Sequence, residues 1–293
     1  MSIKRAVIPV AGHGTRLLPA TKSQPKEMLP VGRKPVVQYV VEELEAAGIN
    51  QMLFVTGSKK RSIEEHFDKD VELLEHLHKS GRKNLIEEMK YQELDVSFYY
   101  VRQSVQRGLA DAIGLARHMV GSESFVVALG DSIVQGSREG ALIKRMIEIH
   151  EKNNAACTIA VEHVPPEETF RYGIVEVGEA KDKGALPIKS LVEKPNVEEA
   201  PSDLAIAARY VFSPDLFDAI DRTLPDRSGE LQLTDSISLL IKKGLPVYAV
   251  PLNEKEQRYD IGNYESYFKA FVDFALADEK YGHTLRHYLS RKL

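Results

Sequence analysis

A segment near the N-terminus combines glycines and cations in a spacing that suits a phosphate ligand. Residues 11–30 read AGHGTRLLPATKSQPKEMLP and follow an apolar run. Gly12 and Gly14 let backbone N–H groups approach an anion closely, and the cations supply counter-charge. Arg16 can bind phosphate oxygens in bidentate fashion, whereas Lys26 is a compact point charge. This chemistry favours a nucleoside triphosphate as the ligand.

Two common nucleotide-binding motifs are absent from the sequence. The turn at residues 12–14 lacks the third glycine of the dinucleotide fingerprint, and residues 55–57 hold no acidic side chain for a ribose. No G-x-x-x-x-G-K-[ST] string occurs, which excludes a P-loop. An isolated G-x-G more often marks a tight turn, so the longer string has to carry the interpretation.

Two aspartates stand where ligands for a divalent cation are expected. Asp131 follows the apolar run of residues 126–129 and a glycine, and Asp260 lies between an apolar segment and an expected helix. Carboxylates at the carboxyl ends of strands can bind Mg²⁺, which takes one or two of them with water and substrate phosphates. Either aspartate could instead belong to a turn or a helix N-terminus.

The string G-x-G-T-R-x-x-P-x-T followed by P-K-E-M-L-P resembles the signature of sugar-1-phosphate nucleotidyltransferases, most of all the uridylyl-transferring members. The resemblance implies transfer of UMP from UTP to glucose 1-phosphate, with UDP-glucose and pyrophosphate as products. It implies that Arg16 and Lys26 are catalytic and that Asp131 and Asp260 hold Mg²⁺. It assigns nucleotide binding to a further set of residues: Ala11, Gly12, Gly14, Thr15, Glu27, Gln103 and Gly108.

A second match lies at Glu193-Lys194-Pro195, although this tripeptide alone is common surface sequence. By resemblance, Glu193 contacts sugar hydroxyls, and Lys194 holds the sugar phosphate and acts in catalysis. Gly173 follows a tyrosine in a segment that resembles the one lying against the sugar. Physically, a hydroxyl-rich ligand needs an acceptor and its phosphate needs a cation.

The base-binding region is expected around Gln103, whose amide suits the paired donor and acceptor edge of uracil. An exposed polar loop residue is the alternative for Gln103. Residues 108–112 read GLADA where the family usually has GLGHA, so Asp111 stands in place of a histidine. This departure, and Ser132 where many relatives have a second aspartate, leave dTTP and another hexose 1-phosphate open as substrates.

The implied reaction is a direct in-line displacement that needs no covalent intermediate, and no Ser/His/Asp arrangement is recognisable. A glycosyltransferase would share the fold but usually shows D-x-D, whereas Asp131 is followed by Ser132 and Ile133. A non-catalytic nucleotide-sugar sensor would be expected to lose some of the charged set. All five of its members are present: Arg16, Lys26, Asp131, Lys194 and Asp260.

Composition predicts an ordinary globular chain. Its 293 residues are 28% charged and 43% hydrophobic, with a net charge of −4, which provides no basic field for nucleic acid or an anionic membrane. No apolar run approaches the roughly 20 residues of a membrane span, and we expect no signal segment. Cys157, the single cysteine, lies in an apolar run, which favours a buried thiol and a reducing cytoplasm.

Alternating apolar and amphipathic segments must position these residues. Strands are predicted at residues 5–10, 51–56, 95–100, 124–129, 155–161, 173–177, 188–193, 205–212 and 246–251. Helices are predicted at residues 36–47, 61–67, 71–91 in pieces, 109–119, 215–223, 233–243 and 264–277. The pattern predicts a Rossmann-like α/β fold with a mixed, mainly parallel sheet covered by helices on both faces, which places the strand-end loops along one edge.

We expect residues 1–293 to form one domain, because no linker or repeat divides the chain. Residues 1–135 would be mainly the nucleotide-binding half, and residues 136–262 mainly the sugar-binding half. Residues 263–293 would be a C-terminal helical segment whose aromatic side chains belong to the core or to a homodimer or homotetramer contact. The charge run at residues 59–66 is interpreted as a solvated helix start.

Overall fold

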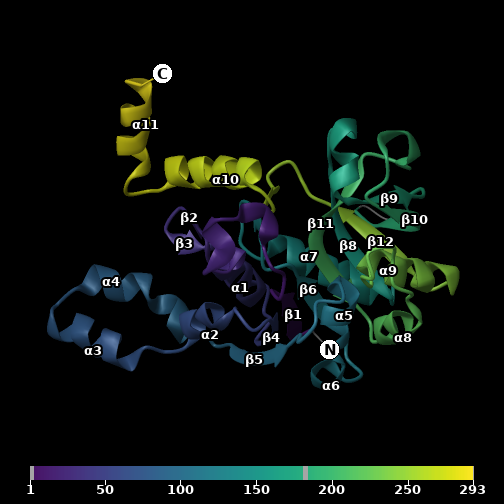
Figure 1. Cartoon of the computed structure of the whole chain (residues 1–293), viewed down its shortest axis with the longest axis horizontal. Coiled ribbons are helices and arrows are strands. Elements are labelled where there is room, and N and C mark those ends of the chain that lie inside the picture. Colours follow the sequence, from purple (N-terminus) through teal and green to yellow (C-terminus); the bar gives the residue numbers. More distant parts are fainter. Residues whose placement is uncertain (1–2, 181–183, 293) are drawn as a thin grey trace.

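The computed structural model describes residues 3–180 and 184–292. A nine-stranded sheet runs through the molecule in the order β5-β4-β1-β6-β11-β8-β12-β10-β9 (Figure 1). Its strands are β1 (Arg5–Pro9), β4 (Gln51–Thr56), β5 (Ser97–Arg102), β6 (Phe125–Ala128), β8 (Cys157–His163), β9 (Gly173–Val177), β10 (Leu186–Glu193), β11 (Leu204–Phe212) and β12 (Val247–Pro251).

The sheet is mixed, and the prediction of a mainly parallel sheet is not confirmed. Strand β1 pairs in parallel with β4 and β6, β4 with β5, and β8 with β12. Strand β11 is antiparallel to β6, β8 and β9, and β10 is antiparallel to β9 and β12. Apolar runs alone do not reveal strand direction. The strands of the second half are joined mostly without the long helical crossovers that parallel neighbours require.

Helices cover both faces of the sheet, as predicted. Helices α1 (Val36–Ala46), α2 (Arg61–Phe67) and α7 (Ala141–Lys152) contribute to one buried apolar cluster, together with Ile8 of β1. Helices α5 (Leu109–Gly114), α6 (Arg117–Val120), α8 (Asp215–Arg222) and α9 (Leu233–Lys242) contribute to the cluster on the other face, which includes Val7. Consecutive side chains of a strand point to opposite faces, so one apolar strand supplies both clusters.

Several element boundaries differ from the prediction. The helix expected at 109–119 is divided into α5 and α6, and the strand expected at 95–100 begins two residues later as β5. The segment before β5 forms α3 (Val71–Lys79) and α4 (Lys83–Glu88), which extend away from the sheet in Figure 1. The unpredicted elements include the short strand pair β2 (Pro30–Val31) and β3 (Lys34–Pro35), the strands β7 (Ser132–Gln135) and β13 (Gln257–Asp260), and the helix α11 (Gly282–Ser290).

The unpredicted pair of strands β7 and β13 brings the two aspartates together. The strands are antiparallel, with Asp260 as the register partner of Ser132. The backbone N–H of Ile261 also donates to the carbonyl of Asp131 at 2.9 Å. A short two-stranded ladder therefore fixes one aspartate directly before β7 and the other at the last position of β13.

A buried arginine holds this ladder in place. Arg209 of β11 is fully buried, and its guanidinium donates to Glu43 Oε2 of α1 at 2.7 and 3.0 Å. The same guanidinium donates to the backbone carbonyl of Ser132 at 2.8 Å. A buried cation is tolerated when it is paired and hydrogen-bonded in this way. Arg209 thus fastens the start of β7 to the helix layer and to the central sheet.

Helix α10 (Tyr264–Ala277) follows β13 and packs on the N-terminal loop. Tyr264 donates its hydroxyl to the carbonyl of Leu17 at 3.1 Å. Tyr264, Tyr267 and Phe274 pack against a third buried apolar cluster, which includes Leu17. The other aromatic residues of the helix point outward, since Phe268 is 58% and Phe271 is 40% exposed. The aromatic repeat therefore divides into a core-facing and an exposed set.

Substituting Asn263 is expected to loosen α10. Its side chain accepts a hydrogen bond from the backbone N–H of Ser266 at 3.0 Å and so caps the helix. Asn263→Ala should lower the free energy of unfolding by about 1 kcal/mol, whereas Asn263→Asp, which keeps the acceptor, should cost only a few tenths. Urea unfolding measures both variants, and an equal loss in the two would contradict the capping role.

Candidate active site

The glycine-rich segment leaves β1 as a loop that Gly14 and Thr21 hold in shape. Gly14 has φ +66° at the start of the short helix η1 (Thr15–Leu17), a left-handed conformation that favours glycine. The Thr21 hydroxyl donates to the Gly14 carbonyl at 2.7 Å. Within the described residues, Gly14 and Thr15 line neither of the two cavities that the other predicted site residues surround. They shape the loop that presents its neighbours.

The first of these is the glycine-loop cavity, of about 240 Å³. It lies at the carboxyl ends of β1 and β6, where ligands bind in open α/β sheets. Predicted site residues dominate its lining: Ala11, Gly12, Lys26, Glu27, Gln103, Gly108 and Asp131.

The second is the Glu193 cavity, of about 220 Å³. It gathers the remaining predicted residues, which come from segments far apart in the sequence: Arg16, Gly173, Glu193, Lys194 and Asp260, with Asp131 again. Arg16 was expected beside the triphosphate, and it lies on this second side. Because Asp131, Leu109 and Leu129 line both cavities, the two form adjoining halves of one site.

The junction of the two cavities is strongly charged. Lys26 forms an ion pair with Asp131, and burial, which disfavours its charged form, is outweighed by the Asp131 and Glu27 carboxylates, so its pKa is raised. The pKa of Asp131 is lowered, because the Lys26 ammonium outweighs burial. The pKa of Asp260 is raised by burial and by the Asp131 carboxylate. The junction therefore holds two neighbouring carboxylates and one ammonium group.

Glu27 is held by a lysine that sequence reasoning missed. Lys60 donates to Glu27 Oε2 at 2.7 Å, and both side chains are almost fully buried. Burial raises the pKa of Glu27, although the Lys60 ammonium opposes that rise. The interpretation of residues 59–66 as a solvated helix start is therefore wrong for Lys60. The sequence feature that could have indicated its burial is the position of Lys60 just after β4, at the same sheet edge as the glycine loop.

Gln103 and Gly108 adjoin at one wall of the glycine-loop cavity. Gln103 is only 5% exposed, so the alternative of an exposed loop residue is wrong. Gly108 has φ +101°, and a Cβ atom there would lie 2.5 Å from the carbonyl oxygen of Leu231. Only glycine fits this close approach of two backbones.

At the other half of the site, Glu193 is oriented by two neighbours. Thr234 of α9 donates its hydroxyl to Glu193 Oε2 at 3.2 Å, and Lys194 Nζ lies 3.2 Å from Oε1. Lys194 has φ +46°, an uncommon conformation for a residue other than glycine. A Cβ atom on Gly173 would lie 2.8 Å from Ile206 and 3.3 Å from Glu193 Oε2, so a larger residue would press on this carboxylate.

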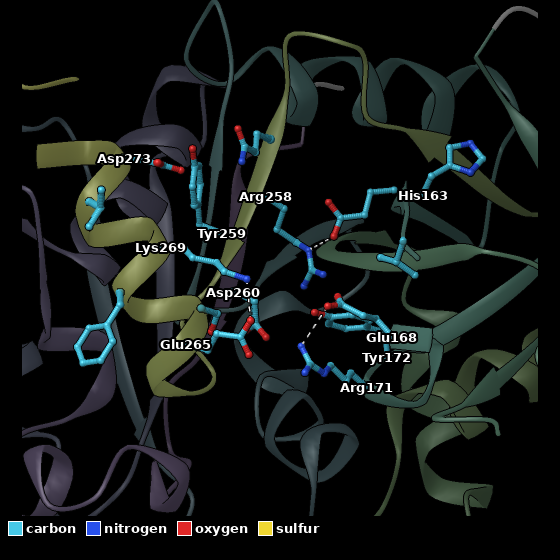
Figure 2. Close-up of a pocket in the computed structure, with 16 residues that line it drawn as sticks. His163, Glu168, Arg171, Tyr172, Arg258, Tyr259, Asp260, Glu265, Lys269 and Asp273 are labelled. Atoms are coloured by element: carbon cyan, nitrogen blue, oxygen red, sulfur yellow. Dashed lines mark hydrogen bonds and ion pairs between the residues drawn. The ribbon is translucent and has the colours of Figure 1, made fainter. Parts of the chain in front are cut away.

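Two arginines beside the Glu193 cavity were not predicted. Arg171 and Arg258 also line a wider, open cleft of about 670 Å³ between α10 and the sheet, drawn in Figure 2. Arg258 is paired with Glu162 and lies over the ring of Tyr172, with 4.6 Å to its centroid. Arg258 stands two residues before Asp260 on β13. Alternation along this strand was the signal that could have revealed it, had the strand been predicted.

Cys157 and two histidines lie outside both cavities. Cys157 is a buried free cysteine in the described chain, as expected, and burial raises the pKa of its thiol well above the usual value. Burial lowers the pKa of His66 and of His150 to about 4. No cluster of three or more His, Cys, Asp or Glu side chains able to hold a metal occurs in residues 3–180 and 184–292. In the same residues, no helix is long and apolar enough to cross a membrane.

Known proteins resemble this chain over nearly its whole length. Residues 5–276 match the model of the nucleotidyl transferase family. UTP–glucose-1-phosphate uridylyltransferase 1 of Staphylococcus saprophyticus is 45% identical over 279 residues, 95% of each chain. The UTP-bound UGPase of Acinetobacter baumannii superposes with a TM-score of 0.89 at 36% identity, covering 98% of both chains. A UDP-glucose pyrophosphorylase complexed with UDP-glucose gives a TM-score of 0.85 at 36% identity, covering 94% of this chain and 100% of that one.

Proposed function

The chain belongs to the nucleotidyl transferase family, and from this we infer that it transfers UMP from UTP to glucose 1-phosphate, forming UDP-glucose and releasing pyrophosphate. The main structural observation in support of this function is that the glycine-loop cavity and the Glu193 cavity adjoin at Asp131. Two anionic substrates can therefore lie with their phosphates at one junction. The similar proteins that carry uridylyltransferase names, and those solved with UTP or UDP-glucose, support this assignment of substrates.

The reaction depends on binding both substrates and on stabilising the charge of the transition state. A phosphate oxygen of glucose 1-phosphate attacks the α-phosphorus of UTP, the new P–O bond forms, and the bond to pyrophosphate breaks. Because the attacking phosphate is already an anion at neutral pH, no general base is required. The protein has to hold two polyanions in line and stabilise the charge of the transition state. We assign this work to three cations: Lys26 on the triphosphate, Lys194 on the incoming phosphate, and Arg16 at the junction.

The carboxylates of Asp131 and Asp260 fit a magnesium ion. Two neighbouring acidic groups, one with a raised pKa, form a donor set that a divalent cation would stabilise. Magnesium commonly takes one or two protein carboxylates and completes its shell with water and substrate phosphates, so two ligands suffice. Mg²⁺ bound there would neutralise phosphate charge during the displacement. We propose Mg²⁺ as the cofactor on this ground.

The experiment that tests the function measures pyrophosphate release by the purified protein with Mg²⁺. UTP and dTTP are each combined with the 1-phosphates of glucose, galactose and N-acetylglucosamine. We expect fast release with UTP and glucose 1-phosphate. Faster turnover with dTTP or another sugar would reassign the substrate, and no release with any pair would favour the non-catalytic sensor.

We further propose that the protein is a cytoplasmic homodimer or homotetramer. The exposed aromatic residues of the C-terminal segment, Phe268, Tyr281 and Tyr288, are each more than half exposed, and α11 projects from the body in Figure 1. Apolar groups gathered on such a segment favour burial against another copy. The single buried Cys157 thiol is consistent with a reducing compartment. Light scattering would measure the assembly, and a monomer at working concentration would contradict it.

A further inference from the structure

The side-chain amide of Gln103 is fixed by two acceptors. Its Nε2 donates to Asp111 Oδ2 at 2.8 Å and to the backbone carbonyl of Gly108 at 3.2 Å. Its backbone N–H donates to the carbonyl of Thr56 at 2.8 Å, which anchors the residue at the end of β5. Main chain and side chain of Gln103 are therefore both held before a ligand arrives.

These contacts decide which end of the amide faces the cavity. A glutamine amide has two N–H donors, and both are used inside the protein. The opposite orientation would place Oε1 against a carboxylate and a carbonyl, which is repulsive. In the described chain no group donates to Gln103 Oε1. Gln103 lines the glycine-loop cavity, and with both amide N–H groups used its side chain retains the Oε1 acceptor for a ligand.

Asp111 does not line the glycine-loop cavity but contacts a residue that does. Gln103, Gly108, Leu109 and Ala112 line the cavity, whereas the Asp111 side chain is only 13% exposed and is directed to Gln103 and Arg107. Arg107 Nη2 lies 3.2 Å from Oδ1, so the two carboxylate oxygens have separate partners. Asp111 therefore contacts the cavity lining through Gln103.

We propose that Asp111 is a positioning residue for nucleobase selection, because it aims Gln103 Oε1 at the N3–H group of a uracil or thymine ring. This inference rests on the proposed function and specifies how its nucleotide is recognised. A uracil or thymine ring donates from N3–H to Oε1. Cytosine has an unprotonated N3, so two lone pairs would face one another across the same gap. A site built to pair one group rejects the analogue that lacks it.

The test compares nucleotides in Asp111→Ala and Asp111→Asn. In Asp111→Ala the Gln103 amide can rotate, so the KM for UTP should rise about tenfold with kcat within about twofold. The UTP:CTP ratio of kcat/KM should fall about tenfold, equivalent to one unbalanced hydrogen bond. The UTP:dTTP ratio should stay within about twofold, since both bases carry N3–H. Asp111→Asn retains an acceptor and should keep more of the UTP:CTP ratio.

The control is Asp218→Asn, which removes an exposed carboxylate from the first turn of α8 and should change no ratio. An unchanged UTP:CTP ratio in Asp111→Ala, or an equal fall in kcat for all three nucleotides, would overturn the proposal. Calorimetric titration of UTP and CTP without a sugar phosphate measures the same ratio as binding. If the parent protein proves inactive, this titration still tests Asp111, so failure of the function and failure of the inference are distinguishable.

Discussion

Asp260→Asn is expected to lower kcat about a thousandfold while making the metal-free protein more stable. The loss follows from weakened Mg²⁺ binding at the junction and amounts to about 4 kcal/mol of transition-state stabilisation. The gain in stability follows because Asp260 is buried and lies beside Asp131, and its raised pKa shows that its charged form is disfavoured in the folded protein. The neutral amide removes that unfavourable charge and should raise the melting temperature by about 2 °C near pH 8.

The pH dependence of this gain has a definite sign. A carboxyl group whose pKa is higher in the folded than in the unfolded protein destabilises the fold above that pKa. As the pH falls below the raised pKa, Asp260 of the folded parent protein takes up a proton, so the stability difference between parent and variant should shrink. The difference should vanish only below the unfolded-state pKa of an aspartate, about 4. Calorimetric melting without metal at a series of pH values from pH 8 downward measures this, with Asp218→Asn as the control. A less stable variant at pH 8, or full activity with Mg²⁺, would contradict the assignment.

The position of several candidate site residues could be predicted from the sequence because they lie at the ends of recognisable strands. Gly12 follows β1, Asp131 follows β6, and Glu193 ends β10. The meeting of Asp131 with Asp260 could not be predicted, since it depends on β7 and β13 pairing across the chain. Both strands are four residues long, and such short segments carry little periodicity.

Burial of charge was the other feature that the sequence did not lead us to predict. Lys60 lies within a run of charged residues, which ordinarily indicates a solvated surface, and only its partner Glu27 makes burial tolerable. Arg209 is fully buried for the same reason, through Glu43. In both cases the partner lies far away in the sequence. The mixed sheet direction is similar, because it depends on where β11 inserts rather than on its composition.

Lys26→Ala is expected to lower kcat by roughly 10²–10³, the range for removing one preorganised group that stabilises transition-state charge. In the structure the Lys26 ammonium is paired with Asp131. Because Mg²⁺ and Lys26 would compete for that carboxylate, metal binding should free the ammonium for the triphosphate. We therefore expect the Lys26 ammonium to pair with Asp131 without substrate and with the triphosphate when UTP and Mg²⁺ are bound.

The Lys26–Asp131 ion pair also allows the catalytic role of Lys26 to be distinguished from a purely structural role. Without Lys26 the Asp131 and Asp260 carboxylates lose their nearest ammonium, so metal-free Lys26→Ala should melt at a lower temperature than the parent. Added Mg²⁺ should restore more stability to the variant than to the parent, while kcat stays low. Lys144→Ala, which removes an exposed lysine from α7, is the control for both readouts. Near-parental turnover in Lys26→Ala, or a kcat that excess Mg²⁺ restores, would show that the ammonium balances the charge of the aspartates without acting on the triphosphate.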